Sequence, residues 1–207
     1  MFTGKSMKKR SISIVLNALI IVFEILGIIH NISFNHRLSL EFFTEQSNVL
    51  ALFACTIFLF YTINNKKIPK WLRLLKYSSV VSLSITFLVV LFILFPMSGF
   101  NVYGMFLFGT LLYHHLICPI LCFVTFIFYD EIYDFTKKDS LYSLVHVGIY
   151  GLIMIILNIL KIFKGPYPFL MVYDQGLFMS IVWIVIIFLL SYGISNIIRV
   201  INSKGVK

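Results

Sequence analysis

Charged residues are scarce in this sequence. Only 12% of its 207 residues are Asp, Glu, Lys or Arg, whereas a soluble domain carries roughly a quarter. Hydrophobic residues make up 60% of the chain, and the mean hydropathy is +0.98. A chain with so few charges cannot cover its surface with groups that water solvates. This excludes an ordinary soluble enzyme, and equally a nucleic-acid-binding domain with a basic, water-exposed face.

Cysteines and known catalytic motifs are also scarce. Cys55, Cys118 and Cys122 all lie in apolar stretches, and their odd number argues against a disulfide framework. Cys118 and Cys122 are one helical turn apart, so a metal pair is conceivable, but buried cysteine more often acts as a small hydrophobic residue. The chain contains neither a His-Glu-x-x-His zinc motif nor a Gly-x-Ser-x-Gly elbow. We therefore predict no metal and no cofactor.

Six long apolar runs occupy most of the chain. A membrane-spanning helix needs about 20 apolar residues, and turn-forming or helix-breaking residues separate the runs. Basic residues precede the first run, but no small-residue cleavage site follows it, so we interpret it as a retained helix. We predict a single all-α domain over residues 1–207, a polytopic membrane protein with six transmembrane helices. The predicted spans are 12–32, 41–63, 72–95, 107–129, 141–163 and 177–198.

The positions of the basic residues predict the orientation. With the N-terminus in the cytoplasm, only Arg37, Lys161 and Lys164 of the 17 Lys and Arg lie outside, which leaves 14 inside. Short loops with this bias follow the positive-inside rule. Both termini are then cytoplasmic, and the basic loops would contact anionic lipid rather than nucleic acid. The predicted location is the cytoplasmic membrane of a bacterium. The inside group consists of Lys5, Lys8, Lys9, Arg10, Lys66, Lys67, Lys70, Arg73, Lys76, Lys137, Lys138, Arg199, Lys204 and Lys207.

Polar residues inside the first two runs mark a candidate site. Asn17, Glu24 and Asn31 recur at intervals of seven, which places them on one helical face. A buried carboxyl group such as Glu24 has either an acid–base or orienting role, or joins helices by a hydrogen bond. In the second run Thr44, Ser47 and Asn48 share a small, polar face. That face indicates either a pocket near the external surface or simple capping of the helix.

The fourth run contains His114, His115 and Pro119. Proline has no amide hydrogen, so the carbonyl of His115 loses its helical partner and we expect a kink there. Such a group needs a cavity or a protein neighbour, at about the depth of Glu24. His114 points about 100° away and could serve in place of His115. His146 is predicted near the cytoplasmic end of the fifth helix, where it cannot meet His115.

Three short motifs carry a resemblance to a known family. They are Phe43-Thr44-Glu45-Gln46-Ser47-Asn48, His115-Leu116-Ile117-Cys118-Pro119 and Pro166-Tyr167-Pro168-Phe169-Leu170, in this order. The chain resembles a bacterial-type relative of the androgen-induced and androgen-dependent TFPI-regulating membrane proteins. The resemblance implies six helices and hydrolysis of fatty acid esters of hydroxy fatty acids. It also implies that Thr44 is the nucleophile and His115 its partner.

The residues are compatible with that reaction, and two other classes stay open. A threonine hydroxyl needs a base within hydrogen-bond reach, which neutral His115 could be. Glu24 could orient the imidazole, while Ser47, Asn48 or Tyr167 could stabilise an oxyanion. The substrate would be a membrane lipid or a fatty-acid ester. The same polar groups would also suit a lipid-binding or small-molecule transport protein, or a structural partner in which they only join helices. The oligomeric state is left open.

Overall fold

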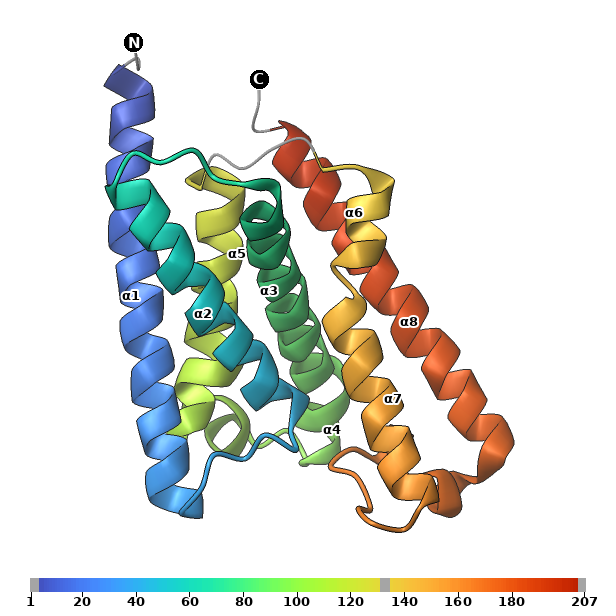
Figure 1. Ribbon diagram of the computed structural model, residues 1–207. Coiled ribbons are helices and arrows are strands. Elements are labelled where there is room, and N and C mark those ends of the chain that lie inside the picture. The colour runs from blue at the N-terminus through green and yellow to red at the C-terminus, as the bar shows by residue number, and fades with distance from the viewer. Residues whose placement is uncertain (1–3, 131–134, 205–207) are drawn as a thin grey trace.

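Helices form nearly all of the regular structure. A computed structural model describes residues 4–130 and 135–204, and this part of the chain contains no strand (Figure 1). The elements are α1 (Gly4–Asn35), α2 (Phe43–Ile63), α3 (Lys70–Val89), η1 (Val90–Leu94), α4 (Phe95–Met97), η2 (Tyr103–Leu107), η3 (Leu112–Ile117), α5 (Cys118–Phe128), α6 (Lys137–Tyr142), α7 (Val145–Ile159), η4 (Pro168–Leu170) and α8 (Val172–Lys204). Of these, η1, η2 and η3 are π-helical and η4 is a 3₁₀ turn.

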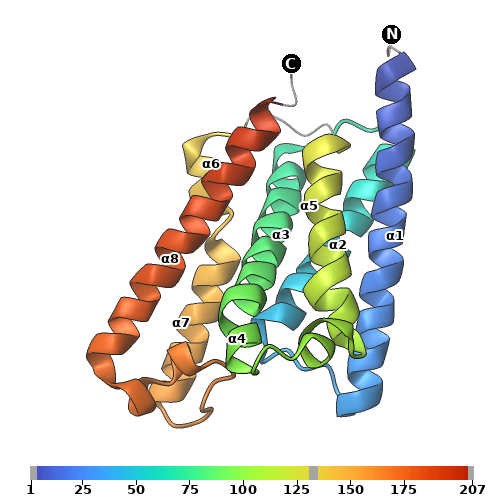
Figure 2. The ribbon, with the colours of Figure 1, turned by 180° about the vertical axis from the view of Figure 1, so that it is seen from behind.

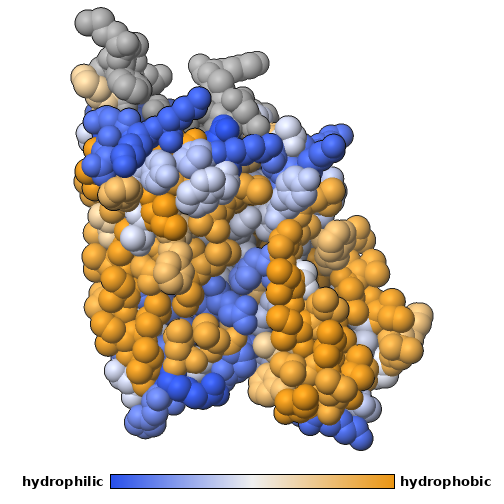
Figure 3. Space-filling view, in the orientation of Figure 1, coloured by the Kyte–Doolittle hydropathy of each residue, from blue (hydrophilic) through white to orange (hydrophobic). Residues whose placement is uncertain are grey.

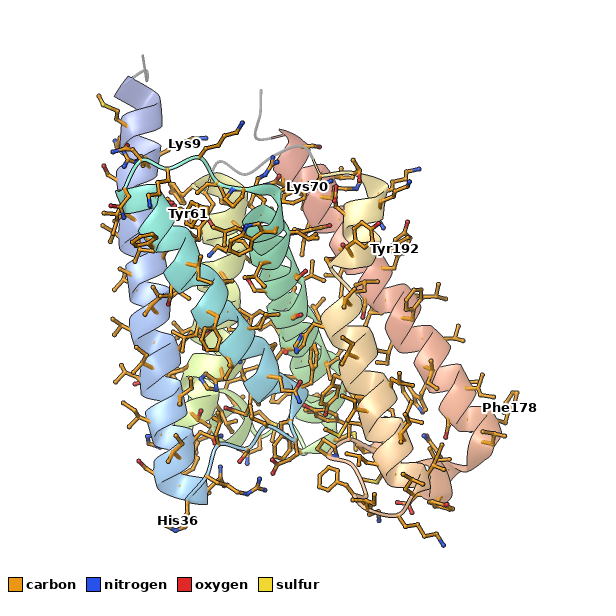
Figure 4. The ribbon with its side chains drawn as sticks, in the orientation of Figure 1. Lys9, His36, Tyr61, Lys70, Phe178 and Tyr192 are labelled. Carbon is orange, nitrogen blue, oxygen red and sulfur yellow. The ribbon has the colours of Figure 1, made fainter. Side chains whose placement is uncertain are left out.

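The helices divide into a bundle and a hairpin. Helices α1, α2, α3 and α5 pack side by side, and α7 and α8 lean away from them at one end (Figures 1 and 2). The start of α1 and the end of α8 lie at the same end of the molecule. Lys9 and Lys70 are also at that end, and His36 is at the opposite one (Figure 4). We call these the basic end and the far end.

Among the described residues, five helices are long and apolar enough to cross a membrane. They cover Met7–Asn35, Phe43–Ile63, Lys70–Met97, Lys137–Ile159 and Val172–Ser203. Large apolar side chains are exposed all along them, and Figure 3 shows an apolar belt with hydrophilic residues gathered at the basic end. A water-soluble monomeric protein rarely exposes an apolar surface of this extent. The chain therefore has the character of a multi-pass membrane protein.

The fourth predicted span, 107–129, is interrupted. The π-helical turn η2 ends at Leu107, and the apolar helix that follows covers only Leu112–Phe128. Gly109 between them has a φ of +55°, and a Cβ there would lie 2.5 Å from His30 Nε2. Only glycine combines that backbone conformation with so close a neighbour. The break therefore comes from a contact with α1 that hydropathy does not register.

The fifth predicted span, 141–163, begins earlier and is also divided. Thr136 and Asp139 form a reciprocal capping box, so α6 starts at Lys137. Helix α7 then begins at Val145. The linker predicted over 130–140 is described only in part, because 131–134 lie outside the described residues.

The division of this span also corrects the predicted position of His146. Its ring stacks on Phe43 in the first turn of α2 at a centroid distance of 5.0 Å. Because α6 occupies the basic end, His146 lies deeper in the molecule than predicted.

Candidate functional site

One face of α1 carries polar residues through the whole bundle. Ser13, Asn17, Glu24 and Asn31 are each at most 3% exposed, which agrees with the predicted alignment of the last three. Between Ser13 and Asn31 the helix rises about 27 Å at 1.5 Å per residue, close to the thickness of a bilayer core. The polar groups gather in two clusters, one toward each end.

The cluster nearer the far end surrounds His114. Its Nδ1 lies 3.1 Å from Glu45 Oε1, and its Nε2 lies 3.6 Å from Glu24 Oε2. The imidazole is fully buried, and so is Glu24, while Glu45 is 4% exposed. Thr110 donates to the carbonyl of Gly27 at 2.9 Å, and its oxygen lies 3.3 Å from Nδ1. We call Glu24, Glu45 and His114 the imidazole cluster.

Gly27 makes room for the ring of His114. A Cβ at this position would lie 2.1 Å from His114 Nε2 and 2.5 Å from its Cδ2. No real side chain tolerates such a contact, so α1 and η3 approach this closely only because residue 27 is glycine. Gly27 follows Glu24 by three residues on α1, and the position of the His114 ring explains why glycine is needed there.

The carboxylate of Glu24 has only weak hydrogen-bond partners. It lies 3.6 Å from His114 Nε2 and next to the thiol of Cys118, and a thiol is a weak donor. Buried polar atoms in native proteins nearly always have partners, and in a membrane-spanning region poorly satisfied groups are especially costly. Two acids, Glu24 and Glu45, thus share one imidazole in a buried position.

The two histidines have different partners. His114 faces Glu24 and Glu45, whereas His115 Nδ1 donates to the carbonyl of Met105 at 2.8 Å. Immediately before Pro119 the chain changes from π-helical geometry in η3 to α-helical geometry at Cys118. A π-helical turn changes the angular spacing of its side chains. The residue that meets the carboxylate of Glu24 is thus His114.

Thr44 lies in a different place, at the wall of a cavity. The cavity has a volume of about 340 Å³ and is bounded by α2, α3, α7, α8 and the segment before α8. Figure 3 shows the surface hollowed between the part that carries α2 and the part that carries α7. Its walls are mostly apolar, and its few polar residues include Thr44, Thr86, Tyr167 and Ser191.

The neighbours of Thr44 are hydroxyl and amide groups. Tyr167 is buried, which raises the pKa of its hydroxyl, while the adjacent Thr44 side chain favours the phenolate and partly opposes this. Ser47 Oγ lies 2.9 Å from Thr86 Oγ1, and Asn48 donates to the carbonyl of Thr44 at 2.7 Å. Ser47 therefore joins α2 to α3, while the Asn48 bond lies within α2, and neither residue is among those that line the cavity.

The predicted site residues thus fall into two groups. Glu24 and His114 belong to the imidazole cluster, and Asn48 reaches it by donating to the carbonyl of His114 at 3.3 Å. Thr44 and Tyr167 belong to the cavity. His115 is not among the residues lining it, so the pairing of Thr44 with His115 stays a prediction.

A second polar cluster lies nearer the basic end. Lys76 Nζ donates to Asn17 Oδ1 at 2.6 Å, lies 2.8 Å from Cys55 Sγ and is 3.5 Å from Asp130 Oδ2. Asp130 Oδ1 accepts hydrogen bonds from Ser13 Oγ at 2.7 Å and Asn17 Nδ2 at 2.8 Å. The side chains of Lys76 and Asp130 are fully buried. We call Ser13, Asn17, Cys55, Lys76 and Asp130 the lysine cluster.

The sequence interpretation missed this cluster. It counted Lys76 with the cytoplasmic basic residues, although Lys76 lies within the predicted span 72–95, and it placed Asp130 in the loop that follows the span 107–129. The available signal was the alignment of Ser13 and Asn17 with Glu24 on the same face of α1. The Sγ atoms of Cys55 and Cys122 are 4.0 Å apart, and within residues 4–130 and 135–204 no group of three or more His, Cys, Asp and Glu side chains is placed to hold a metal ion.

Comparison of the chain with models of known families, with curated proteins and with solved structures finds no match. The function of the site therefore has to be inferred from the chemistry of its residues. An apolar cavity with hydroxyl groups in its wall suits a molecule with an apolar chain and a polar head. A buried imidazole between two carboxylates suits proton transfer.

Proposed function

We propose that this chain is a six-span membrane protein that binds the acyl chain of a membrane lipid or fatty-acid ester in the cavity beside Thr44. The span that brings the number to six, the fourth in chain order, would be the apolar helix Leu112–Phe128 together with the π-helical turn η2 before it. The basic end would face the cytoplasm, in accordance with the positive-inside rule. The observation that carries the proposal is the cavity itself, an apolar space with hydroxyl groups in its wall.

The size and lining of the cavity support an acyl ligand. Its volume of about 340 Å³ falls at the lower end of the range of roughly 300–1,000 Å³ for small-molecule sites. Ile85, Val89, Ile155 and Phe188 are among its apolar wall residues. Burying methylene groups against such walls contributes about 0.8 kcal/mol each. The hydroxyls of Thr44 and Tyr167 would then meet the head group.

Two glycines of α7 keep the cavity open. Gly148 and Gly151 both line it, and a Cβ built on either would meet nothing within 4 Å. They are three residues apart, so they occupy the same face of the helix. Glycine lowers helix stability by up to about 1 kcal/mol relative to alanine. The presence of two glycines on the face of α7 that lines the cavity therefore favours a cavity that holds a ligand.

Hydrolysis of the bound ester is the second candidate. It is favoured by the position of Thr44 in the cavity wall next to Tyr167 and by the resemblance to a family of lipid-ester hydrolases. It ranks second because a threonine nucleophile needs a base within hydrogen-bond reach, and the lining residues include no histidine. In this reaction His115 would have to leave Met105 and approach Thr44.

The binding proposal is tested with Trp183, which lies in the cavity wall. In a Trp71→Phe background Trp183 is the only tryptophan of the chain, so its fluorescence reports on the cavity. We expect a brominated fatty acid to quench it saturably in detergent-purified protein. Gly151→Leu should abolish the saturable part by filling the cavity. Gly193→Leu is the matched control, because a Cβ there also meets nothing within 4 Å but does not line the cavity. Equal quenching in both variants would contradict the proposal.

The hydrolase candidate has its own test. Purified protein is incubated with a fatty acid ester of a hydroxy fatty acid, and the released acid is measured. Turnover that is lost in Thr44→Ala and in His115→Ala, with saturable binding retained, supports the enzyme. Turnover that survives in either variant rejects the assigned roles.

A further inference from the structure

The imidazole cluster is distinct from the cavity. Glu24, Glu45 and His114 come from α1, α2 and η3, and none of them is among the residues that line the cavity. Each ring nitrogen of His114 faces a different carboxylate. Glu45 faces Nδ1 at 3.1 Å, and Glu24 faces Nε2 at 3.6 Å.

The charges of this cluster do not balance without added protons. With both carboxylates ionised and the imidazole neutral, the three groups carry two negative charges in a fully enclosed position. Protonating the imidazole still leaves one negative charge. An unpaired charge inside a membrane-spanning bundle costs several kcal/mol, so neutrality requires two protons distributed over three basic groups. One of the three is then always free to receive a proton.

The weakly satisfied hydrogen-bonding positions are the ones that proton transfer would use. Glu24 Oε2 lies 3.6 Å from His114 Nε2, and the other neighbour of this carboxylate is the weakly donating thiol of Cys118. The gap of 3.6 Å is slightly longer than a hydrogen bond, and a small rotation of the Glu24 side chain closes it.

The three groups also form a path with a direction. Glu45 is in the first turn of α2 at the far end and keeps a small exposure of 4%, whereas Glu24 is fully buried. Glu24 is seven residues before Asn31 on α1, or about 10 Å deeper along the axis. Histidine carries protons by accepting one at one ring nitrogen and releasing one from the other.

We propose that Glu45, His114 and Glu24 form a proton relay that delivers protons from the far end of the bundle to Glu24 in its interior. Glu45 receives the proton from the surface and donates it to Nδ1 of His114. Nε2 of the imidazole releases a proton to Glu24, and reorientation of the ring or its tautomer returns it to the starting state. Gly27 is the positioning residue, because its missing side chain lets the ring lie between the two acids.

The groups around the relay set its limits. Those facing His114 are Glu24, Glu45 and the hydroxyl of Thr110. Beyond Glu24 toward the basic end lie thiols and then the lysine cluster, where Lys76 is already paired with Asp130. The relay therefore ends at Glu24. The ionisable groups that act on Glu24, besides His114, are Glu45 and Cys55 of α2, Cys118 of α5 and Lys76 of α3.

The experiment is infrared difference spectroscopy of the full chain in lipid nanodiscs. A pH step should produce the carbonyl-stretch band of a protonated carboxylic acid that is lost in Glu24→Gln and kept in Asp130→Asn. In His114→Gln, which cannot shuttle protons, hydrogen–deuterium exchange of that band should slow by roughly tenfold or more. Glu45→Gln should slow it similarly, which provides an independent reading if His114→Gln does not fold.

Three results would overturn the relay. The first is a pH step that produces no carboxylic acid band. The second is a band that persists in Glu24→Gln, because the protonated group would then be another residue. The third is exchange of the Glu24 band at the wild-type rate in the His114 and Glu45 variants, which would show that protons reach Glu24 by another route.

Discussion

The two polar clusters on α1 differ in how their buried charges are balanced. In the lysine cluster the amine faces a carboxylate, and Asp130 Oδ1 accepts two further hydrogen bonds. In the imidazole cluster two carboxylates, those of Glu24 and Glu45, face a single imidazole, that of His114, at 3.6 Å and 3.1 Å. The comparison indicates that the first cluster holds α1, α3 and the end of α5 together. The second is built to change its protonation.

The comparison predicts the largest effect for Lys76→Met. Removing the amine leaves Asp130 as a buried, uncompensated charge, which costs about 3–5 kcal/mol. Unfolding of detergent-solubilised protein measures this loss. Lys70→Met is the matched control on the same helix, because the Lys70 side chain is 75% exposed and its pairing contributes only about 0–1 kcal/mol. Similar losses in both variants would show that the lysine cluster is not a structural lock.

A smaller effect is expected for Gly27→Ala. The new methyl group would occupy the position of the His114 ring, and overpacking of this kind costs about 1–3 kcal/mol. Gly148→Ala serves as the control, because nothing lies within 4 Å of its Cβ. It should be neutral or raise the free energy of unfolding by up to about 1 kcal/mol. If Gly27→Ala is as well tolerated as the control, the ring of His114 does not depend on glycine for its position.

The smallest effect on stability is expected for Glu24→Gln. Glutamine is close in shape to the protonated, uncharged form of Glu24 that neutrality of the cluster favours, so the free energy of unfolding should change by about 1 kcal/mol or less. Asp130→Asn, the same acid-to-amide change in the lysine cluster, should destabilise clearly more because it weakens the ion pair with Lys76. A Glu24 variant that loses as much stability as the Asp130 variant would make both clusters structural.

Local patterns predicted the long helices well. Apolar runs set the spans of α1, α2, α3 and α8, because a helix satisfies its own backbone hydrogen bonds wherever it meets hydrocarbon. The polar face of α1 was also predictable, because helical periodicity repeats within one segment. The interruption at Gly109 was not, because it depends on the approach of His30 from another helix.

The site was predictable as a set of residues and not as an arrangement. Thr44, Glu24 and the histidine pair were all found from sequence, and the prediction combined them in one site. The structure instead places Thr44 in a cavity with Tyr167 and places Glu24 beside His114. Which histidine faces inward depends on the π-helical geometry of η3, and no residue pattern in this chain encodes that turn by itself.

By itself the sequence determined that the chain is helical and belongs in a membrane, and that α1 presents polar groups along one face. These properties follow from composition and from the local repeat of a helix. The tertiary structure alone decided which polar groups meet, because helix rotation, the π-helical turn at η3 and the close approach at Gly27 join residues far apart in the chain, up to the 117 positions between Ser13 and Asp130. It placed the amine of Lys76 against Asp130, and it placed two acids, Glu24 and Glu45, against the single imidazole of His114. This difference separates the structural cluster from the one that we propose carries protons.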